Sequence, residues 1–182
     1  MPSQNTFVAL LRGINLGGKN PLSMQDVAGL FADAGASDVR TYIQSGNVVF
    51  RAPVRVAERL PTFVSKRIAE RFALRVPVLL RSAAQLAEIA HGNPFLRAGG
   101  STDFLHVVFL ADEPDPRRVA SLDSKRSPPD QFAVIGREIY LRCPNGIGRS
   151  KLTNDYFDRT LGTTTTGRNW RTVLKLIELA SK

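Results

Sequence analysis

The chain has 182 residues, 43% of them hydrophobic, so it can bury a core without disulfides or a structural metal, and it is not a disordered polymer. Cys143 is the single cysteine, which excludes an internal disulfide, and no apolar run is long enough for a signal peptide or a membrane span. We therefore expect a soluble cytoplasmic protein with no membrane partner. The formal net charge of +9 is compatible with nucleic acid or another anion, but the positive residues are dispersed as on an ordinary solvated surface.

The first half of the chain predicts elements in the order βαββαβ. Thr6 to Arg12 has the pattern of a buried strand. Ser23 is placed to cap a helix, and Gly35 is placed to end it. A hairpin follows around Ser45-Gly46. The remaining predicted elements are a helix ending near Phe72, a strand at Val76 to Arg81 and a linking helix at Ser82 to His91. This is the order of a ferredoxin-like unit.

The helix that ends near Phe72 carries an apolar stripe and a basic surface. The stripe consists of Leu60, Val64, Ile68 and Phe72. Pro61 fits best in the first turn, because a proline inside a helix removes a hydrogen bond. The other faces carry Arg59, Lys66, Arg67 and Arg71, which we interpret as a solvated surface.

The second half predicts a related βαββα order with a final helix. A cluster of turn residues marks the boundary: Gly92, Pro94, Gly99 and Gly100. The predicted elements are a strand at Phe104 to Ala111, a short helix beginning near Pro116, a hairpin around Gly136-Arg137, and helices at Leu152 to Leu161 and Asn169 to Ala180. The last helix is expected to bury Trp170, Val173, Leu174 and Ile177 on one face. We therefore predict an α+β fold of duplicated ferredoxin-like units, with helices packed on antiparallel or mixed sheets and with halves at 1–91 and 92–182.

The segment between the first strand and the first helix fits the pattern GxxxxGK, which is most of a phosphate-binding P-loop. Asn20 stands where a P-loop has the Ser or Thr that holds magnesium, and Pro21 and Leu22 precede the cap. The hairpin order also predicts an antiparallel sheet, unlike the parallel sheet of P-loop proteins. We therefore interpret this segment as a structural turn in which glycines adopt positive φ, and not as a nucleoside triphosphatase site.

Two further loops combine glycine, a positive side chain and an expected helix start. Residues 145–151 are expected to open the helix at Leu152. Residues 163–169 are expected to form the loop that opens the last helix, with Thr166 as its cap. Capping and turn geometry explain each loop alone. Together the three loops motivate the hypothesis that they converge on one anion site, with Lys19, Arg149 and Arg168 around a common hollow. The candidate ligand-binding residues are Arg12, Gly13, Asn15, Gly17, Gly18, Lys19, Ser45, Asn47, Gly148, Arg149, Ser150, Lys151, Arg168 and Asn169.

Several chemistries are not supported by the sequence. The two histidines and one cysteine form no ligand-like cluster, so we expect no metal site, and no cofactor is indicated. Ser45 lacks the GxSxG elbow of a serine hydrolase, and nothing near Cys143 would lower its pKa. No GxGxxG follows a strand, and Val48-Val49-Phe50 lacks the aromatic pattern of an RNA-recognition domain. No catalytic residue can be named.

Four segments carry long and specific motifs: Phe7 to Asn20, Arg40 to Phe50, Gly146 to Leu152 and Arg168 to Val173. In these segments the chain resembles domain-of-unknown-function family 1697. The resemblance implies a bacterial, cytosolic α+β protein with duplicated ferredoxin-like halves. It implies no established activity, ligand or catalytic residue.

Three functions therefore stay open from the sequence. The first is a binding or regulatory protein for a small anionic ligand, such as a nucleotide or a phosphorylated metabolite, held by the glycine-rich basic loops. The second is a nucleic-acid-binding protein that uses its basic surface. The third is a transferase-like enzyme with the same anion pocket. The oligomeric state is not indicated.

Overall fold

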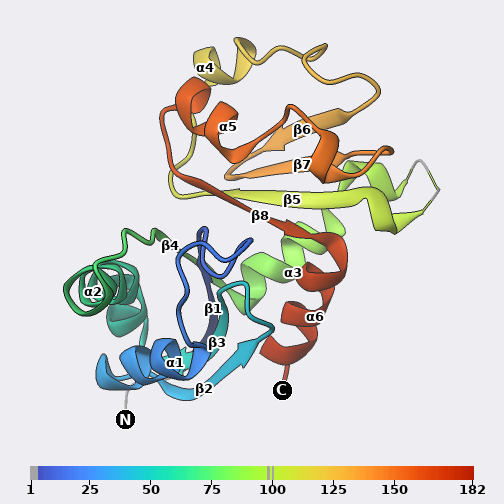
Figure 1. Ribbon diagram of the computed structural model, residues 1–182. Coiled ribbons are helices and arrows are strands. Elements are labelled where there is room, and N and C mark those ends of the chain that lie inside the picture. The colour runs from blue at the N-terminus through green and yellow to red at the C-terminus, as the bar shows by residue number, and fades with distance from the viewer. Residues whose placement is uncertain (1–3, 98, 100) are drawn as a thin grey trace. The chain divides into compact units, whose positions relative to one another are not determined.

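A computed structural model describes residues 4–97, 99 and 101–182, and Gly100 of the predicted boundary lies outside them. The structure confirms an α+β protein with two four-stranded antiparallel sheets and helices packed on them (Figure 1). The chain divides into two compact units. Unit 1 comprises Met1–Ala87 with Leu176–Lys182, and unit 2 comprises Glu88–Lys175. The division falls inside the helix Ala83–His91, whereas the boundary predicted from the sequence follows His91.

The sheet of unit 1 has the strand order β2-β3-β1-β4, and every neighbouring pair is antiparallel. Its strands are β1 (Asn5–Leu11), β2 (Ser37–Tyr42), β3 (Asn47–Ala52) and β4 (Val78–Ser82). Its first two helices are α1 (Met24–Asp33) and α2 (Val54–Phe72), and α3 (Ala83–His91) follows β4. The predicted element order of this half is confirmed.

One face of this sheet forms the core with α1 and α2. Alternate residues of the central strands, such as Ala9, Leu11 and Phe50, point to this face and are fully buried, as period-2 geometry requires. Phe31 of α1 contacts Phe50 with ring centroids 5.2 Å apart. The predicted cap of α1 is confirmed, because the Ser23 side chain accepts from two backbone N–H groups of the first turn.

Helix α2 begins earlier than the sequence suggested, and the placement of Pro61 in its first turn is wrong. The helix starts at Val54, after Pro53, so Pro61 lies in its interior. An interior proline costs about 3 kcal/mol. The helix nevertheless buries Leu60, Val64 and Ile68, and each such side chain contributes roughly 1.5–3 kcal/mol. Burial of the apolar face therefore outweighs the missing hydrogen bond.

The sheet of unit 2 repeats the arrangement with the order β6-β7-β5-β8. Its strands are β5 (Leu105–Leu110), β6 (Gln131–Ile135), β7 (Glu138–Arg142) and β8 (Thr165–Asn169). Its helices are α4 (Pro116–Ala120), α5 (Asn154–Leu161) and the start of α6 (Trp170–Ala180), with short 3-10 turns at η1 (Pro94–Leu96), η2 (Thr102–Phe104) and η3 (Ile147–Arg149). The last strand is a correction, because residues 163–169 were predicted as a loop. The strand completes a second βαββαβ unit, consistent with a duplicated ferredoxin-like arrangement.

The core of unit 2 lies between this sheet and the pair α4 and α5, as Figure 1 shows. Phe157 of α5 is fully buried and contacts both Tyr156 and Phe132 through its ring. The Tyr156 hydroxyl accepts a hydrogen bond from Asp123 N at 2.9 Å, which satisfies the polar end of a buried ring.

The strand registers show how closely the two units correspond. In unit 1, Val8 of β1 pairs with Arg81 of β4, and in unit 2, Val107 of β5 pairs with Arg168 of β8. Both arginines are buried, and each donates from Nη1 to the carbonyl of the preceding residue. The next residue, Ser82 or Asn169, then accepts from the N–H three positions later and caps a helix. The internal duplication therefore includes a buried arginine and the helix that follows it.

Helix α6 differs from its predicted apolar face at two positions. Trp170 and Val173 are buried as predicted, but Leu174 is exposed and Ile177 is only partly buried. Leu176 and Ala180 complete the buried stripe. A spacing of three to four residues selects this set. Within the described part of the chain, no helix is long and apolar enough to cross a bilayer.

Candidate functional site

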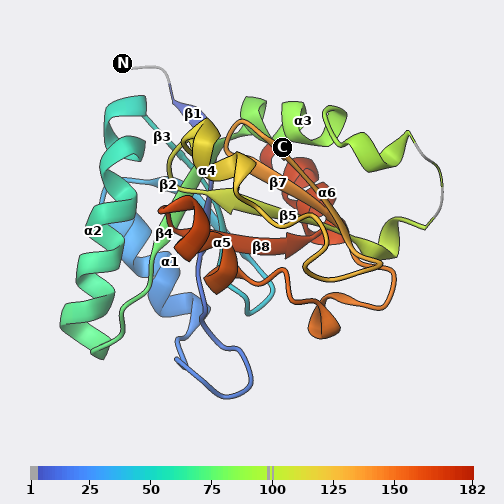
Figure 2. The same ribbon diagram turned by 90° about the horizontal axis from the view of Figure 1, so that it is seen from above.

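The loop between β1 and α1 extends far beyond the sheet of unit 1 (Figure 2). One side chain organises it. Asn15 Nδ2 donates to Leu22 O and to Gln44 O, both at 2.8 Å, and Asn15 Oδ1 accepts from Leu22 N at 2.8 Å. Asn15 therefore joins the two ends of the loop and attaches them to the β2–β3 turn. Its predicted role as a ligand contact stays a prediction.

The tip of the loop is a tight turn on the surface. Lys19 N donates to Leu16 O at 2.9 Å, and Gly17 and Gly18 between them have φ of 55° and 76°. Two consecutive positive φ angles define a type I′ turn, which glycine adopts without steric cost. Asn20 Nδ2 closes the base of the loop by donating to Gly13 O at 2.9 Å. The exposed glycines and Lys19 are therefore presented by a loop whose shape is already fixed.

The β2–β3 turn lies against the base of this loop. Gly46 has φ of 80°, and a Cβ on it would lie 2.7 Å from Leu11 Cβ, so only glycine fits. Asn47 is fully buried, and its Nδ2 donates to Tyr42 O and Ser45 Oγ. Ile43 has φ of 49°, a conformation that strains a β-branched residue. Ser45 and Asn47 therefore maintain the turn that receives the Asn15 side chain.

The second predicted loop follows β7 in unit 2. Gly146 has φ of 84° and precedes η3, in which Gly148 and Arg149 are exposed. Ser150 Oγ accepts from Leu152 N at 3.1 Å. The loop precedes a helix as expected, but the predicted helix start at Leu152 is two residues too early. Helix α5 begins at Asn154, and Thr153 caps it by accepting from Tyr156 N.

The 145–151 loop is fastened to the segment before β6. Lys151 N donates to Ser127 Oγ at 3.0 Å, and Arg126 Nε donates to Lys151 O at 3.0 Å. The Arg126 guanidinium also stacks 4.0 Å from the centre of the Tyr156 ring. The exposed Lys151 side chain is therefore carried by an anchored backbone.

Cys143 lies at the start of this loop and is buried. Burial raises its pKa to about 11, with a smaller contribution from Asp130. The thiol is therefore protonated at neutral pH and is not an activated nucleophile, in agreement with the sequence analysis.

Arg168 is in β8, which corrects its predicted position in a loop. Its guanidinium donates to Thr166 Oγ1 at 2.9 Å and to Gly167 O at 2.7 Å. Burial lowers its pKa to about 10, so it stays charged at neutral pH. Thr166 does not cap α6, since it belongs to the same strand, and Asn169 performs that role by accepting from Thr172 N at 2.8 Å.

The predicted site residues thus form two groups. The structure brings Gly13, Asn15 and the 43–47 turn together in unit 1, with Arg12 half-buried beside them and Lys19 at the exposed tip. In unit 2, the 145–151 loop follows β7, and Asn169 is the last residue of β8. Both strands pair antiparallel with β5, so their last residues lie at the same end of the sheet. The convergence of Lys19 with Arg149 and Arg168 concerns both units and stays a prediction.

Sequence reasoning missed two residues of this region. Arg81 is 2% exposed, against 9% for Arg168, and the signal for it was a charged residue inside the apolar strand Val78–Ser82. Asn20 was noted only as a departure from the P-loop pattern, whereas it closes the loop. Its positive φ of 48° is one that asparagine tolerates better than most residues.

Comparison with known proteins gives a family but no activity. The family model described as a protein of unknown function, DUF1697, matches residues 4–140, which is more than half of the chain. The chain belongs to the DUF1697 family. This confirms the resemblance seen in the sequence, and the matched residues include the loop at Asn15 and the turn at Gly46.

Among solved structures, this DUF1697 protein is similar to a conserved bacterial protein from Streptococcus pneumoniae. The two chains are 19% identical with a TM-score of 0.70, and the match covers 98% of this chain and 99% of the other. At that identity the likeness concerns the fold alone. No curated protein matches this chain.

Proposed function

We propose that this DUF1697 protein binds a small anionic ligand, such as a nucleotide or a phosphorylated metabolite, through its basic glycine-rich loops. The observation that carries the proposal is the β1–α1 loop, whose side-chain hydrogen bonds fix an exposed Gly17-Gly18-Lys19 tip. A loop that is already ordered loses little entropy on binding. Exposed glycine N–H groups beside a lysine ammonium suit phosphate oxygens.

Further cations would complete the site in this proposal. Arg12 lies at the base of the same loop, and Arg149 and Lys151 are exposed in unit 2. Arg168 would contribute from a buried position, still charged at neutral pH. Together these groups would neutralise a ligand that carries two or more negative charges.

A thermal-shift screen with nucleotides, sugar phosphates and short oligonucleotides tests the proposal. A ligand at about 100 times its Kd stabilises the folded protein by about 2.7 kcal/mol, which raises the Tm by roughly 5–10 °C in a chain of this size. Lys19→Ala should abolish most of that rise. Lys125→Ala is the matched control, because Lys125 is exposed and lies outside the three loops. If no anion raises the Tm of the natural protein, the proposal is wrong.

A double-mutant cycle tests whether the loops share one ligand. Lys19→Ala and Arg149→Ala should show coupling in ligand affinity if both side chains contact the same molecule. Strictly additive losses of binding free energy would show that the two loops do not contact the same ligand.

Nucleic-acid binding is the alternative, and the net charge of +9 favours it. Salt distinguishes the two, because a polyanion releases many counterions and its affinity falls steeply between low and physiological salt. A small anion with only a few charges should show a much shallower dependence of affinity on salt.

A further inference from the structure

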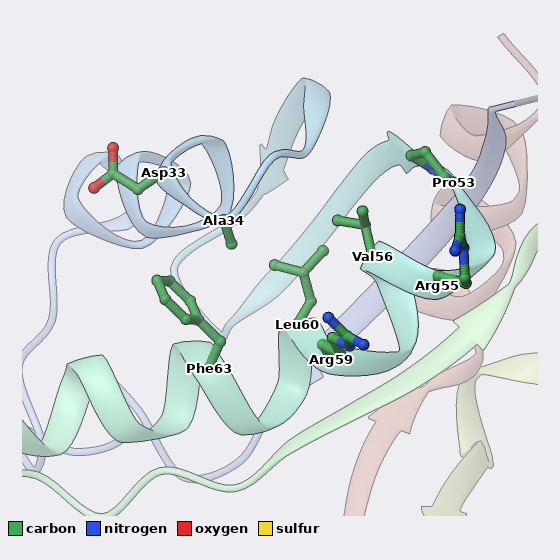
Figure 3. Close-up of a pocket in the computed structure, with 8 residues that line it drawn as sticks. All are labelled: Asp33, Ala34, Pro53, Arg55, Val56, Arg59, Leu60 and Phe63. Atoms are coloured by element: carbon green, nitrogen blue, oxygen red, sulfur yellow. The ribbon is translucent and has the colours of Figure 1, made fainter. Parts of the chain in front are cut away.

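A groove of about 540 Å³ lies between α1 and α2 in unit 1 (Figure 3). Its apolar floor comes from both helices. Ala34 closes it at the end of α1, and Val56, Leu60 and Phe63 line it along α2. These three α2 residues follow helical spacing and so share one face. Leu60 is buried, but Val56, Phe63 and Ala34 keep part of their surface exposed.

Two exposed arginines, Arg55 and Arg59, border this floor from the first turns of α2. Among residues 4–97, 99 and 101–182, no carboxylate forms an ion pair with either guanidinium. The first turn of α2 also contains no acidic residue, and no side chain caps it. The positive end of the helix dipole therefore adds to the two arginine charges.

The second half of α2 is different. Arg67 pairs with Glu70 at 3.2 Å, and Arg71 pairs with Asp26 of α1 at 3.3 Å. A second hollow of about 360 Å³ lies there, and Asp33 lines both hollows. The two hollows follow α2 from Pro53 to Arg71, a length of roughly 28 Å at 1.5 Å per residue. Arg67 and Arg71 therefore have carboxylate partners at one end of this elongated groove, whereas, among the described residues, the charges of Arg55 and Arg59 are uncompensated at the end near Pro53.

We propose that the α1–α2 groove binds an acidic amphipathic helix of a partner protein. Its apolar side chains would pack on Val56, Leu60 and Phe63, in the manner of a helix in a hydrophobic groove. Two of its carboxylates, one helical turn apart, would pair with Arg55 and Arg59, which are themselves one turn apart. Asp33 on the opposite wall favours a basic or neutral residue there, which fixes the orientation of the bound helix.

The shape of the groove favours a helix over a compact small molecule. Small-molecule sites enclose most of their ligand, whereas the apolar side chains here form a row along α2, with only Ala34 and Asp33 facing them from the end of α1 (Figure 3). The proposal does not depend on the anion site of the loops, since no residue of the β1–α1 loop lines either hollow.

Fluorescence anisotropy with designed peptides on the full chain tests the proposal. The probe is a labelled amphipathic helix with leucines on one face and glutamates flanking them, and the control probe has lysine at every glutamate position. The acidic peptide should bind saturably, and the Arg55→Glu, Arg59→Glu double variant should weaken it at least about ten-fold, or roughly 1.4 kcal/mol. Arg75→Glu is the matched control, because Arg75 is exposed in the same unit and lines neither hollow. Higher salt should weaken the binding.

Further measurements identify the occupant. Amide shifts in a heteronuclear spectrum should concentrate at Ala34, Val56 and Phe63 when the acidic peptide binds.

Equal affinity for both peptides, no saturable binding of the acidic one, or equal effects of Arg75→Glu and the double variant would overturn the proposal. Displacement of the peptide by octanoate would assign the groove to a small organic anion instead. Self-association that the double variant abolishes would assign it to a second copy of the chain, and either result also overturns the proposal. Lys19→Ala should leave peptide binding unchanged, so failure of the anion site remains distinguishable.

Discussion

Replacement of Gly46 by alanine tests the idea that the β2–β3 turn and β1 are fitted to each other. Alanine at φ of 80° costs about 1–2 kcal/mol in backbone conformation alone. Its Cβ would also lie 2.7 Å from Leu11 Cβ and 3.0 Å from Leu11 O, so the turn must move away from the strand. That movement weakens the hydrogen bond from Leu11 N to Gly46 O, now 2.8 Å long, and leaving a buried N–H unsatisfied costs about 1–3 kcal/mol.

The sum is a destabilisation of about 2–5 kcal/mol for Gly46→Ala. Gly17→Ala is the matched control, since Gly17 has φ of 55° but nothing within 4 Å of its would-be Cβ. The control should therefore lose only the conformational part. The free energies of unfolding in urea, followed by far-ultraviolet circular dichroism, measure both. If the two variants agree to within about 0.5 kcal/mol, the close approach to Leu11 contributes nothing and the reasoning fails.

Three other predictions concern single side chains. Asn15→Ala removes three hydrogen bonds and Asn20→Ala removes one, and both place alanine at a positive φ, so the strain of that conformation adds to both losses. Asn15→Ala should therefore lower the free energy of unfolding by about 2 kcal/mol more than Asn20→Ala, and equal losses in urea unfolding would show that Asn15 does not organise the loop. Arg168→Ala and Arg81→Ala should each lower the free energy of unfolding by about 3–5 kcal/mol. Arg149→Ala, at an exposed position, should change it by no more than about 0.5 kcal/mol. If Arg168→Ala leaves the stability unchanged, β8 does not need its buried arginine. Burial raises the pKa of Cys143 from its ordinary value of 9.0 to about 11, so folding favours the protonated thiol. This contribution to stability is complete below pH 9 and is lost as the pH rises to 11. Over that range the free energy of unfolding should therefore fall less in Cys143→Ala than in the natural protein.

Most elements were predictable because local patterns and tertiary packing agree for them. β1 is an apolar run, Ser23 stands at a capping position, and both hairpins turn at glycines of positive φ. β8 was not predictable by this route. Its sequence Thr165–Asn169 contains no large apolar side chain, and Gly167 and Asn169 are residue types that are depleted in strands, so pairing with β5 decides its structure.

The candidate site was predictable as chain segments but not as contacts. The positive φ of Gly17 and Gly18 follows from the glycine-rich sequence. The link from Asn15 to Gln44 does not, because 29 residues separate them and only the fold brings them together. In the same way, the pattern of α2 indicated its basic residues. Only the structure distinguishes Arg55 and Arg59 from Arg67 and Arg71, which have carboxylate partners.

Unit 1 is assembled from two stretches that are far apart in the chain, since Leu176–Lys182 belongs to it although all of unit 2 lies between. During synthesis, unit 1 can therefore be completed only after the end of α6 has been made. A fragment cut at the predicted boundary would lack that closing segment. Adding residues 176–182 back as a separate peptide should restore resistance to proteolysis in such a fragment, because the missing piece is short and helical.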